Sequence, residues 1–240
     1  MNQPITFASQ YKYGLKRGTP IALGYIPVSF AFGLMAVSNG LSPWLAIFIS
    51  LSNLTSAGQF AGTSLIIQNA GYIEITLTTF IINIRYMLMS LSLSQKLDSK
   101  VTLIERFIFS FGITDETFAV AAAEKMELSY GYMLGLITGP ILGWSTGTAL
   151  GAFICSALPS TFSAALGIAL YGMFLAIIIP PAKHSTTVLG VILSACALSC
   201  IMSVVPYIKE ISTGFRVIIV TLLVCSIGAL VAPIKDEQLV

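Results

Sequence analysis

Most of this chain consists of apolar segments about twenty residues long, separated by short polar turns. A run of that length crosses a hydrocarbon layer of about 30 Å as an α-helix, at about 1.5 Å per residue. The alternating pattern of a membrane β-barrel is absent, so the sequence predicts an all-α, polytopic transmembrane helix bundle. The predicted spans are residues 19–37, 74–93, 103–123, 131–155, 161–180, 186–206 and 214–232.

One further segment, 44–69, is too long and too polar for a plain span. Its middle, from Asn53 to Gln59, reads Asn-Leu-Thr-Ser-Ala-Gly-Gln. We expect the helix to break there, with a second half-helix beginning near Gly58, because glycine is a poor helix former. Two interpretations compete: one broken span, or a re-entrant pair of half-helices that returns to the side it left.

The positions of Lys and Arg favour re-entry. With the amino terminus inside, eight basic residues lie inside and three outside if 44–69 re-enters, against six and five if it crosses. Cytoplasmic loops carry the excess of positive charge, so the first arrangement is preferred. We therefore predict about seven spans plus a re-entrant hairpin in a single transmembrane domain, 19–232. Residues 1–18 are predicted to form a cytoplasmic interfacial arm, and 233–240 a short tail on the outside.

Composition supports a membrane protein and narrows its function. Hydrophobic residues make up 56% of the 240 positions and charged residues 9%, whereas a soluble domain carries about 25% charged residues. A net charge of +2 gives no reason to expect nucleic acid as a partner. Four cysteines without a C-x-x-C pair, and a single histidine, His184, in an outer turn, predict neither a metal site nor a cofactor. No catalytic set of residues is present, so an enzyme is not expected.

Charged residues inside the predicted spans mark the strongest candidate site. Arg85 precedes the loop 95–106 by ten residues and Asp115 follows it by nine, so both are expected about 15 Å into the layer, near its middle. Charge at that depth is costly and usually functional. By contrast, Glu74 and the charged loop 124–127 are expected to be solvated outer ends of spans.

The two adjacent acids, Asp115 and Glu116, cannot both face Arg85, because neighbouring side chains point about 100° apart on a helix. Arg85 is expected to pair with one of them, to hold a substrate carboxylate, or to do both in turn. The other acid would carry a proton or bind a substrate ammonium. The alternative for this stretch is a short polar loop where a helix breaks at Gly112.

The break in 44–69 is a second candidate site. Non-helical backbone at membrane depth survives where it lines a cavity or is buried in protein, and the free N–H groups of a half-helix suit a substrate carboxylate. A purely structural break is the alternative, as is core packing for Trp144. The predicted substrate-binding residues are Asn53, Ser56, Gly58, Gln59, Asn83, Arg85 and Trp144.

A stripe of glycines recurs every four residues along the span 131–155. Its members are Gly131, Gly135, Gly139, Gly143, Gly147 and Gly151. Small residues at this spacing let helices approach closely, but the stripe drifts about 40° per step. We therefore expect that one straight partner cannot follow all six glycines. Ordinary internal packing and docking of another subunit both remain open.

Several short motifs recur in a characteristic order and spacing. They are Gly24-Tyr25-Ile26-Pro27 with Ala31-Phe32-Gly33, Ser56-Ala57-Gly58-Gln59-Phe60-Ala61, Asn83-Ile84-Arg85-Tyr86, Thr114-Asp115-Glu116-Thr117 and the glycine-rich span with Trp144. Together they resemble the AzlC-type (azaleucine-resistance) branched-chain amino acid permeases, over roughly residues 14–180. The resemblance implies a bacterial inner-membrane exporter with a small AzlD-type membrane partner. Tyr86 stands where the family often has His, which argues against proton coupling at that position.

The principal hypothesis is a secondary transporter, the large subunit of an exporter driven by the proton-motive force. Its substrates would be valine, leucine and isoleucine, with methionine as a further candidate. Apolar residues such as Phe60 and Trp144 would accept the aliphatic side chain. Two other classes stay open: a channel or passive pore for small polar solutes, and a non-transporting membrane scaffold that docks through the glycine stripe.

Overall fold

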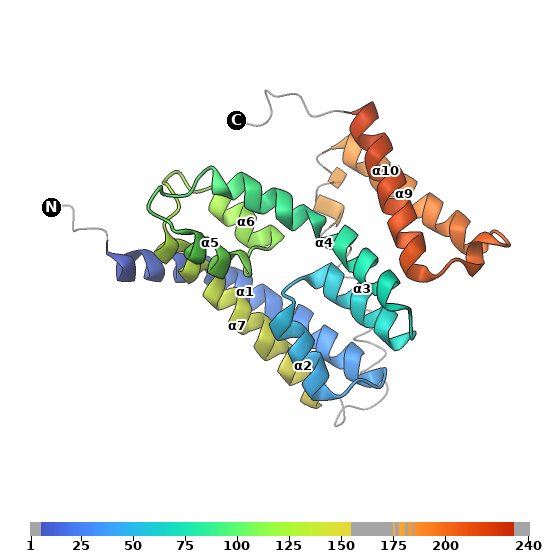
Figure 1. Ribbon diagram of the computed structural model, residues 1–240, viewed down its shortest axis with the longest axis horizontal. Helices are drawn as coiled ribbons and strands as arrows, with labels where there is room; N and C mark the ends of the chain where they lie inside the picture. Colours follow the sequence, from blue (N-terminus) through green and yellow to red (C-terminus); the bar gives the residue numbers. More distant parts are fainter. Residues whose placement is uncertain (1–5, 155–174, 176–177, 181, 184, 233–240) are drawn as a thin grey trace. The chain divides into compact units, whose positions relative to one another are not determined.

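The computed structural model describes residues 6–154, 175, 178–180, 182–183 and 185–232, and helices make up the regular structure of this part (Figure 1). Four of these helices are long and apolar enough to cross a membrane. They are α1 (Phe7–Ser38), α4 (Tyr72–Ser94), α9 (Thr186–Val204) and α10 (Thr213–Val231). The predicted class, a helical membrane protein, is confirmed, while the number of spans stays a prediction. The predicted span 161–180 and His184 fall largely outside the described residues.

The chain divides into two compact units. Unit 1 contains residues 1–60 and 82–167, and unit 2 contains 61–81 and 168–240. Residues 7–18, in the predicted interfacial arm, form the first turns of α1, and their position at an interface stays a prediction. Thr6 caps this helix in a capping box with Ser9, which satisfies backbone donors that the first turn leaves free.

Unit 1 is organised around α1 and α7 (Tyr130–Ile154), which lie side by side (Figure 1). All six glycines of the stripe face α1: Gly131 lies against Phe7 and Gly151 against Phe30. The contacts advance along both helices in the same direction, so the helices are parallel. One helix, α1, which contains Pro20 and Pro27, therefore follows the whole stripe, and the expectation that a straight partner could not do so stays a prediction. The stripe is internal packing, and the docking of another subunit on these glycines is excluded in this structure.

Glycines on α1 complete this close approach from the other side. A Cβ on Gly14 would overlap the backbone of Tyr132, and one on Gly33 would overlap the backbone of Thr148. The two backbones are therefore in direct contact along their length, as small residues at four-residue spacing permit. Pro20 and Pro27 lie inside α1 without ending it.

The predicted break in 44–69 is confirmed. Helix α2 (Pro43–Ser52) ends at Asn53, and α3 (Ser56–Ile67) begins after Thr55. The second half-helix begins near Gly58 as predicted, at Ser56, so Gly58 lies in the first turn of α3. Its lack of a side chain serves a close contact, since a Cβ there would lie 2.5 Å from Asn83 Oδ1.

A second break overturns the predicted span 103–123. Helix α5 (Leu103–Ser110) and helix α6 (Asp115–Ala122) are separated by a turn. The amine of Lys96, before this segment, donates to the backbone oxygens of Ala122 and Glu124 after it, at 2.6 and 2.7 Å. The segment therefore returns to where it began, and it is a hairpin of two half-helices rather than a crossing.

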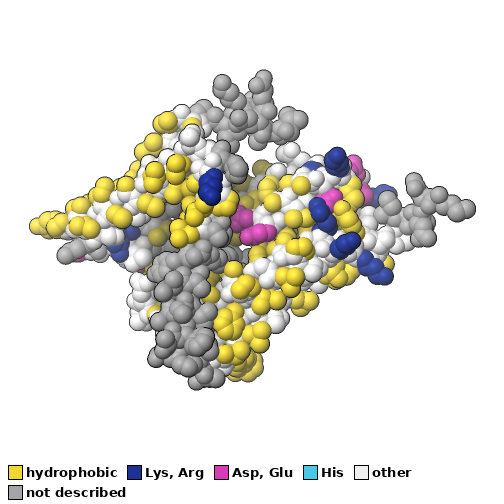
Figure 2. All heavy atoms as spheres, turned by 180° about the vertical axis from the view of Figure 1, so that it is seen from behind, with side chains coloured by type: hydrophobic (Ala, Val, Ile, Leu, Met, Phe, Trp, Pro, Cys, Tyr) yellow, Lys and Arg dark blue, Asp and Glu magenta, His cyan; other side chains and the backbone are white. Residues whose placement is uncertain are grey.

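The loop after α6 lies at the end of unit 1 where α1 begins. Glu124 Oε1 pairs with Arg17 Nε at 2.9 Å and accepts hydrogen bonds from the hydroxyls of Tyr13 and Tyr132. The predicted outer position of this charged loop, opposite the amino terminus, is therefore wrong. Figure 2 shows most of the visible Lys and Arg side chains gathered towards the N-terminal end of the chain.

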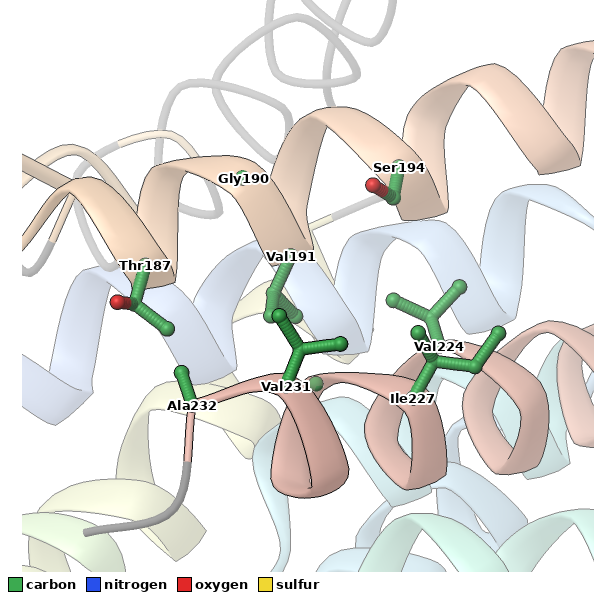
Figure 3. A pocket seen from close by; sticks show the side chains of 9 residues that line it. Thr187, Gly190, Val191, Ser194, Val224, Ile227, Val231 and Ala232 are labelled. Atoms are coloured by element: carbon green, nitrogen blue, oxygen red, sulfur yellow. The ribbon is translucent and has the colours of Figure 1, made fainter.

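In unit 2, α9 and α10 form an antiparallel hairpin closed by the short η2 (Ile208–Glu210). Met202 packs against Val220 and Val224. A cavity of about 320 Å³ lies between the two helices and is lined by Thr187, Gly190, Val191, Ser194, Val224, Ile227, Gly228, Val231 and Ala232 (Figure 3). Among the described residues that line it, the polar side chains are the two hydroxyls of Thr187 and Ser194.

Candidate functional site

Helix α4 supplies the cation of the site. Arg85 lies nine residues before the last residue of the helix, Ser94, which places it about 13 Å from that end. Its guanidinium lies over the ring of Tyr86, 5.2 Å from the ring centroid, so the cation is oriented by the neighbouring aromatic face. This position holds Arg85 well inside a helix of membrane-spanning length.

The second break supplies the acids. Thr114 is the N-cap of α6: its Oγ1 accepts from the N–H of Thr117, and Thr117 Oγ1 accepts from the N–H of Thr114 at 2.8 Å. This reciprocal cap fixes where the half-helix starts. Asp115 and Glu116 consequently fall in its first turn, where the helix dipole favours negative charge.

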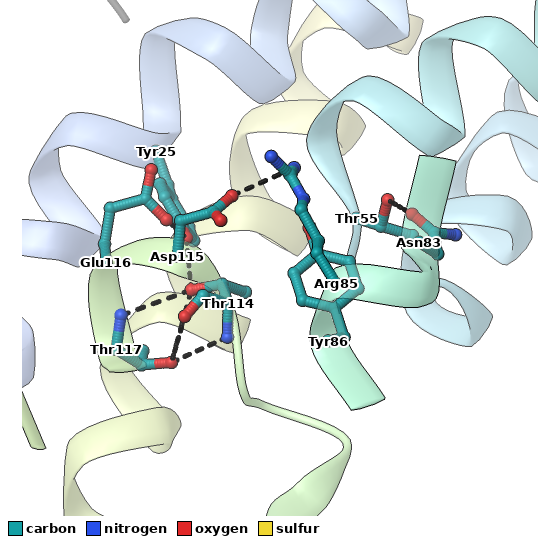
Figure 4. A network of polar contacts seen from close by, with 9 residues as sticks. All are labelled: Tyr25, Thr55, Asn83, Arg85, Tyr86, Thr114, Asp115, Glu116 and Thr117. Atoms are coloured by element: carbon teal, nitrogen blue, oxygen red, sulfur yellow. Dashed lines mark hydrogen bonds and ion pairs between the residues drawn. The ribbon is translucent and has the colours of Figure 1, made fainter. Parts of the chain in front are cut away.

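The two elements meet in an ion pair (Figure 4). Arg85 Nη2 lies 2.9 Å from Asp115 Oδ2, and each side chain is 43% exposed. The predicted pairing of Arg85 with an acid of this stretch is confirmed, and the partner is Asp115. Arg85 Nε is buried and has no hydrogen-bond partner in the described part of the chain. One donor of the cation is therefore left without a hydrogen bond in this conformation.

Glu116 turns away from the pair towards α1. Its Oε2 accepts a hydrogen bond from the hydroxyl of Tyr25, which also lies 2.7 Å from Thr114 Oγ1 (Figure 4). The two adjacent acids thus diverge, as helix geometry requires. Sequence reasoning assigned no role to Tyr25. Its signal was a single hydroxyl within an otherwise apolar stretch, two residues before Pro27.

The first break is joined to α4 through Asn83. Thr55 Oγ1 donates to Asn83 Oδ1 at 2.7 Å, beside Gly58 (Figure 4). Two other predicted residues of this break, Asn53 and Ser56, are partly buried. Asn83 and Arg85 stand two positions apart on α4, so one helix carries contacts to both breaks.

Gln59 and Trp144 occupy a different, fully packed place. Trp144 Nε1 donates to Gln59 Oε1 at 3.0 Å, Gln59 donates to Ser50, and Ser50 lies 2.7 Å from Thr148. All four side chains are at most 2% exposed. This chain of bonds ties α2, α3 and α7 together, and neither predicted residue faces open space in this conformation. Their use as substrate contacts stays a prediction.

The site offers a cation, two carboxylates and two half-helix starts within one unit. A free amino acid carries one carboxylate and one ammonium, which this combination can bind through charge-assisted hydrogen bonds. Among the residues that the structure describes, no three His, Cys, Asp or Glu side chains gather closely enough to hold a metal ion.

Comparison with known proteins agrees with this membrane architecture. A family model described as "AzlC protein" matches residues 20–158. The chain is 30% identical over 204 residues to "Inner membrane protein YgaZ" of Escherichia coli, covering 81% of this chain and 83% of that protein. It is 32% identical over 180 residues to a membrane protein of Archaeoglobus fulgidus, covering 73% and 78%. No solved structure matches.

Proposed function

Because the chain belongs to the AzlC family of membrane proteins, we propose that it is the large subunit of a secondary transporter that exports branched-chain amino acids. The observation that carries this proposal is the Arg85–Asp115 ion pair, partly exposed and set between a long helix and the start of a half-helix. Its place in the cell would be the inner membrane of a bacterium.

The ion pair can exchange its partner for substrate. An incoming carboxylate would replace Asp115 at Arg85, aided by the free Nε of the guanidinium. The released Asp115, or the exposed Glu116, would then receive the substrate ammonium. Half-helix starts at mid-membrane hold substrates in this way in transporters with broken helices.

The aliphatic side chain of the substrate would lie near the first break. Opening of the contact between Gln59 and Trp144 would expose the aromatic surfaces of Trp144 and Phe60 to it. The same movement would release Asn53, Ser56 and Gly58 to contact the substrate carboxylate. Binding and opening would thus be coupled, which is the basic requirement of alternating access.

Energy would come from the proton-motive force, with Asp115 or Glu116 exchanging a proton when the ion pair opens. A small AzlD-type membrane subunit is the proposed partner. Since the glycine stripe is used inside the chain, that partner would need another surface. The scaffold hypothesis loses the docking face on which it depended.

Efflux of labelled valine from cells that carry the transporter tests the proposal. Arg85→Ala and Asp115→Asn are each expected to abolish efflux at unchanged membrane levels, because each removes one partner of the zwitterion. Lys125→Ala and Glu127→Gln, exposed charges in the loop after α6, are the matched controls and should keep full efflux.

Wild-type efflux in both site variants would remove this pair from the mechanism. Flux that does not saturate and ignores an uncoupler would indicate a passive pore instead of a transporter.

A further inference from the structure

Unit 2 contains a buried acid that the proposed substrate site does not use. Glu74, in the first turn of α4, is 7% exposed, and its Oε1 accepts a hydrogen bond from the backbone N–H of Gly214 at 2.9 Å. The expectation that Glu74 is a solvated end is therefore wrong. Its carboxylate caps α10, whose own N-cap residue, Ser212, makes no side-chain cap bond.

A second buried polar group points at the same place. Thr78 lies one turn after Glu74 on α4, and residues four apart share a helix face. It is 1% exposed, and its hydroxyl has no hydrogen-bond partner among the described residues. A Cβ built on Gly214 would lie 2.6 Å from both Thr78 Oγ1 and Glu74 Oε1. The carboxylate and the hydroxyl therefore both lie close against Gly214, in the first turn of α10.

A buried hydroxyl without a partner is unfavourable, so a state in which it makes a hydrogen bond is favoured. We propose that Glu74, Thr78 and the first turn of α10 form a proton-binding site, separate from the Arg85–Asp115 pair. The ionised carboxylate accepts from Gly214 N–H. When a proton binds the other carboxylate oxygen, the new O–H group donates to the Thr78 hydroxyl, which has no partner among the described residues while the carboxylate is ionised.

A metal cation suits this position less well than a proton. One carboxylate and one hydroxyl meet at Gly214, whereas a hard cation such as Ca²⁺ takes about six to eight oxygen ligands. The charged neighbour on α10 is Arg216, which donates to Thr213 and Ser203. Within the described residues no ion pair joins Arg216 to Glu74.

Infrared spectroscopy of the purified full-length protein tests the site without any substrate. The difference spectrum between acidic and neutral pH should contain the C=O stretching band of a buried carboxylic acid. Glu74→Gln should lose that band, while its amide oxygen still caps α10. Glu127→Gln, the control, should retain it, and Thr78→Val should shift it because the acid loses its acceptor.

Two outcomes would overturn the inference. A band that is unchanged in both Glu74→Gln and Thr78→Val would show that Glu74 does not bind the proton. A band that responds to sodium at fixed pH, rather than to pH, would show a metal-cation site. If Glu74→Gln accumulates poorly, the shift of the C=O band in Thr78→Val still tests the site.

A transport assay then relates the site to coupling, and this step rests on the proposed function. In proteoliposomes, Glu74→Gln should keep counterflow of labelled leucine but lose its acceleration by a pH gradient. A coupling role would be excluded if Glu74→Gln kept the acceleration by the pH gradient. It would also be excluded if Glu74→Gln lost counterflow together with that acceleration. Absence of counterflow in the wild-type protein would contradict the proposed function but leave the infrared result valid.

Discussion

Arg85 and Asp115 form an ion pair whose two side chains are each 43% exposed. Breaking a fully buried ion pair by removing one partner costs about 3–5 kcal/mol, whereas exposed pairs contribute about 0–1 kcal/mol. A half-exposed pair is therefore inexpensive to open when another anion takes over. At the predicted membrane depth each charge needs a partner of opposite sign. An unpaired charged side chain at the centre of a membrane helix costs about 2.5–3.5 kcal/mol on insertion scales.

Tyr25 is expected to tune this site through Glu116. Hydrogen bonds to charged groups contribute about 1.5–3 kcal/mol, so Tyr25→Phe should raise the KM for amino acid efflux by about tenfold or more. Tyr11→Phe is the matched control, since Tyr11 is on the same helix and bonds to Thr138 instead. An unchanged KM in Tyr25→Phe would mean that the orientation of Glu116 does not matter for binding.

The helices of this chain differ in how accurately their bounds could be predicted from the sequence. Long apolar runs such as α4 and α10 were predicted to within two residues at each end. The turn at 111–114 was considered only as an alternative, because the run 103–123 has the length and hydropathy of a span. Contact with another helix accompanies the end of α5, because a Cβ on Gly112 would overlap Ile137 of α7. The N-cap Thr114 then starts a new helix.

The charged residues of the site could be predicted from the sequence, but the contacts between the helices around it could not. Depth counting identified Arg85, Asp115 and Glu116, and helix geometry required the two acids to diverge. Sequence spacing could not show that Gln59 bonds to Trp144, because that contact joins helices 85 residues apart. It also could not show that α1 winds along every glycine of α7.

The glycine contact between α1 and α7 should dominate the stability of unit 1. Gly147→Ala is expected to lower the melting temperature in detergent by several degrees, because its Cβ would overlap the backbone of Ile26 and overpacking costs about 1–3 kcal/mol. Gly24→Ala is the control, since a Cβ there meets nothing within 4 Å. Equal melting temperatures for both variants would contradict the packing described for α7.

For the whole molecule, the contacts imply a membrane topology with two hairpins. The loop after α6 adjoins the start of α1, so 103–123 returns to the side on which α1 begins. Glu74 of α4 bonds to the start of α10, so both helices begin on the same side. With the predicted amino terminus inside, the predicted re-entry of 44–69 and the predicted span at 161–180, we predict six spans and both termini inside.

The distribution of positive charge supports this revised topology. Nine Lys and Arg residues then lie inside and two outside, with Arg85 in the membrane. The separation is sharper than the eight and three of the sequence-based arrangement, and the positive-inside rule favours it. Fewer spans therefore account better for both the contacts and the charges.

Cysteine labelling with a membrane-impermeant maleimide checks this topology in intact cells. In a background without native cysteines, Asn39→Cys, in the turn after α1, should be labelled from outside. Lys125→Cys, in the loop after α6, should be labelled only after permeabilisation, as should Lys12→Cys. Labelling of Lys125→Cys in intact cells would restore a crossing at 103–123.

Equilibrium binding of labelled leucine to the purified full-length protein, with and without its small partner, tests the central claim most directly. The wild-type protein and the controls Lys125→Ala and Glu127→Gln should bind leucine saturably, whereas Arg85→Ala and Asp115→Asn should each lose binding at least tenfold. Wild-type affinity in both site variants would show that the ion pair between α4 and α6 is not where the amino acid binds.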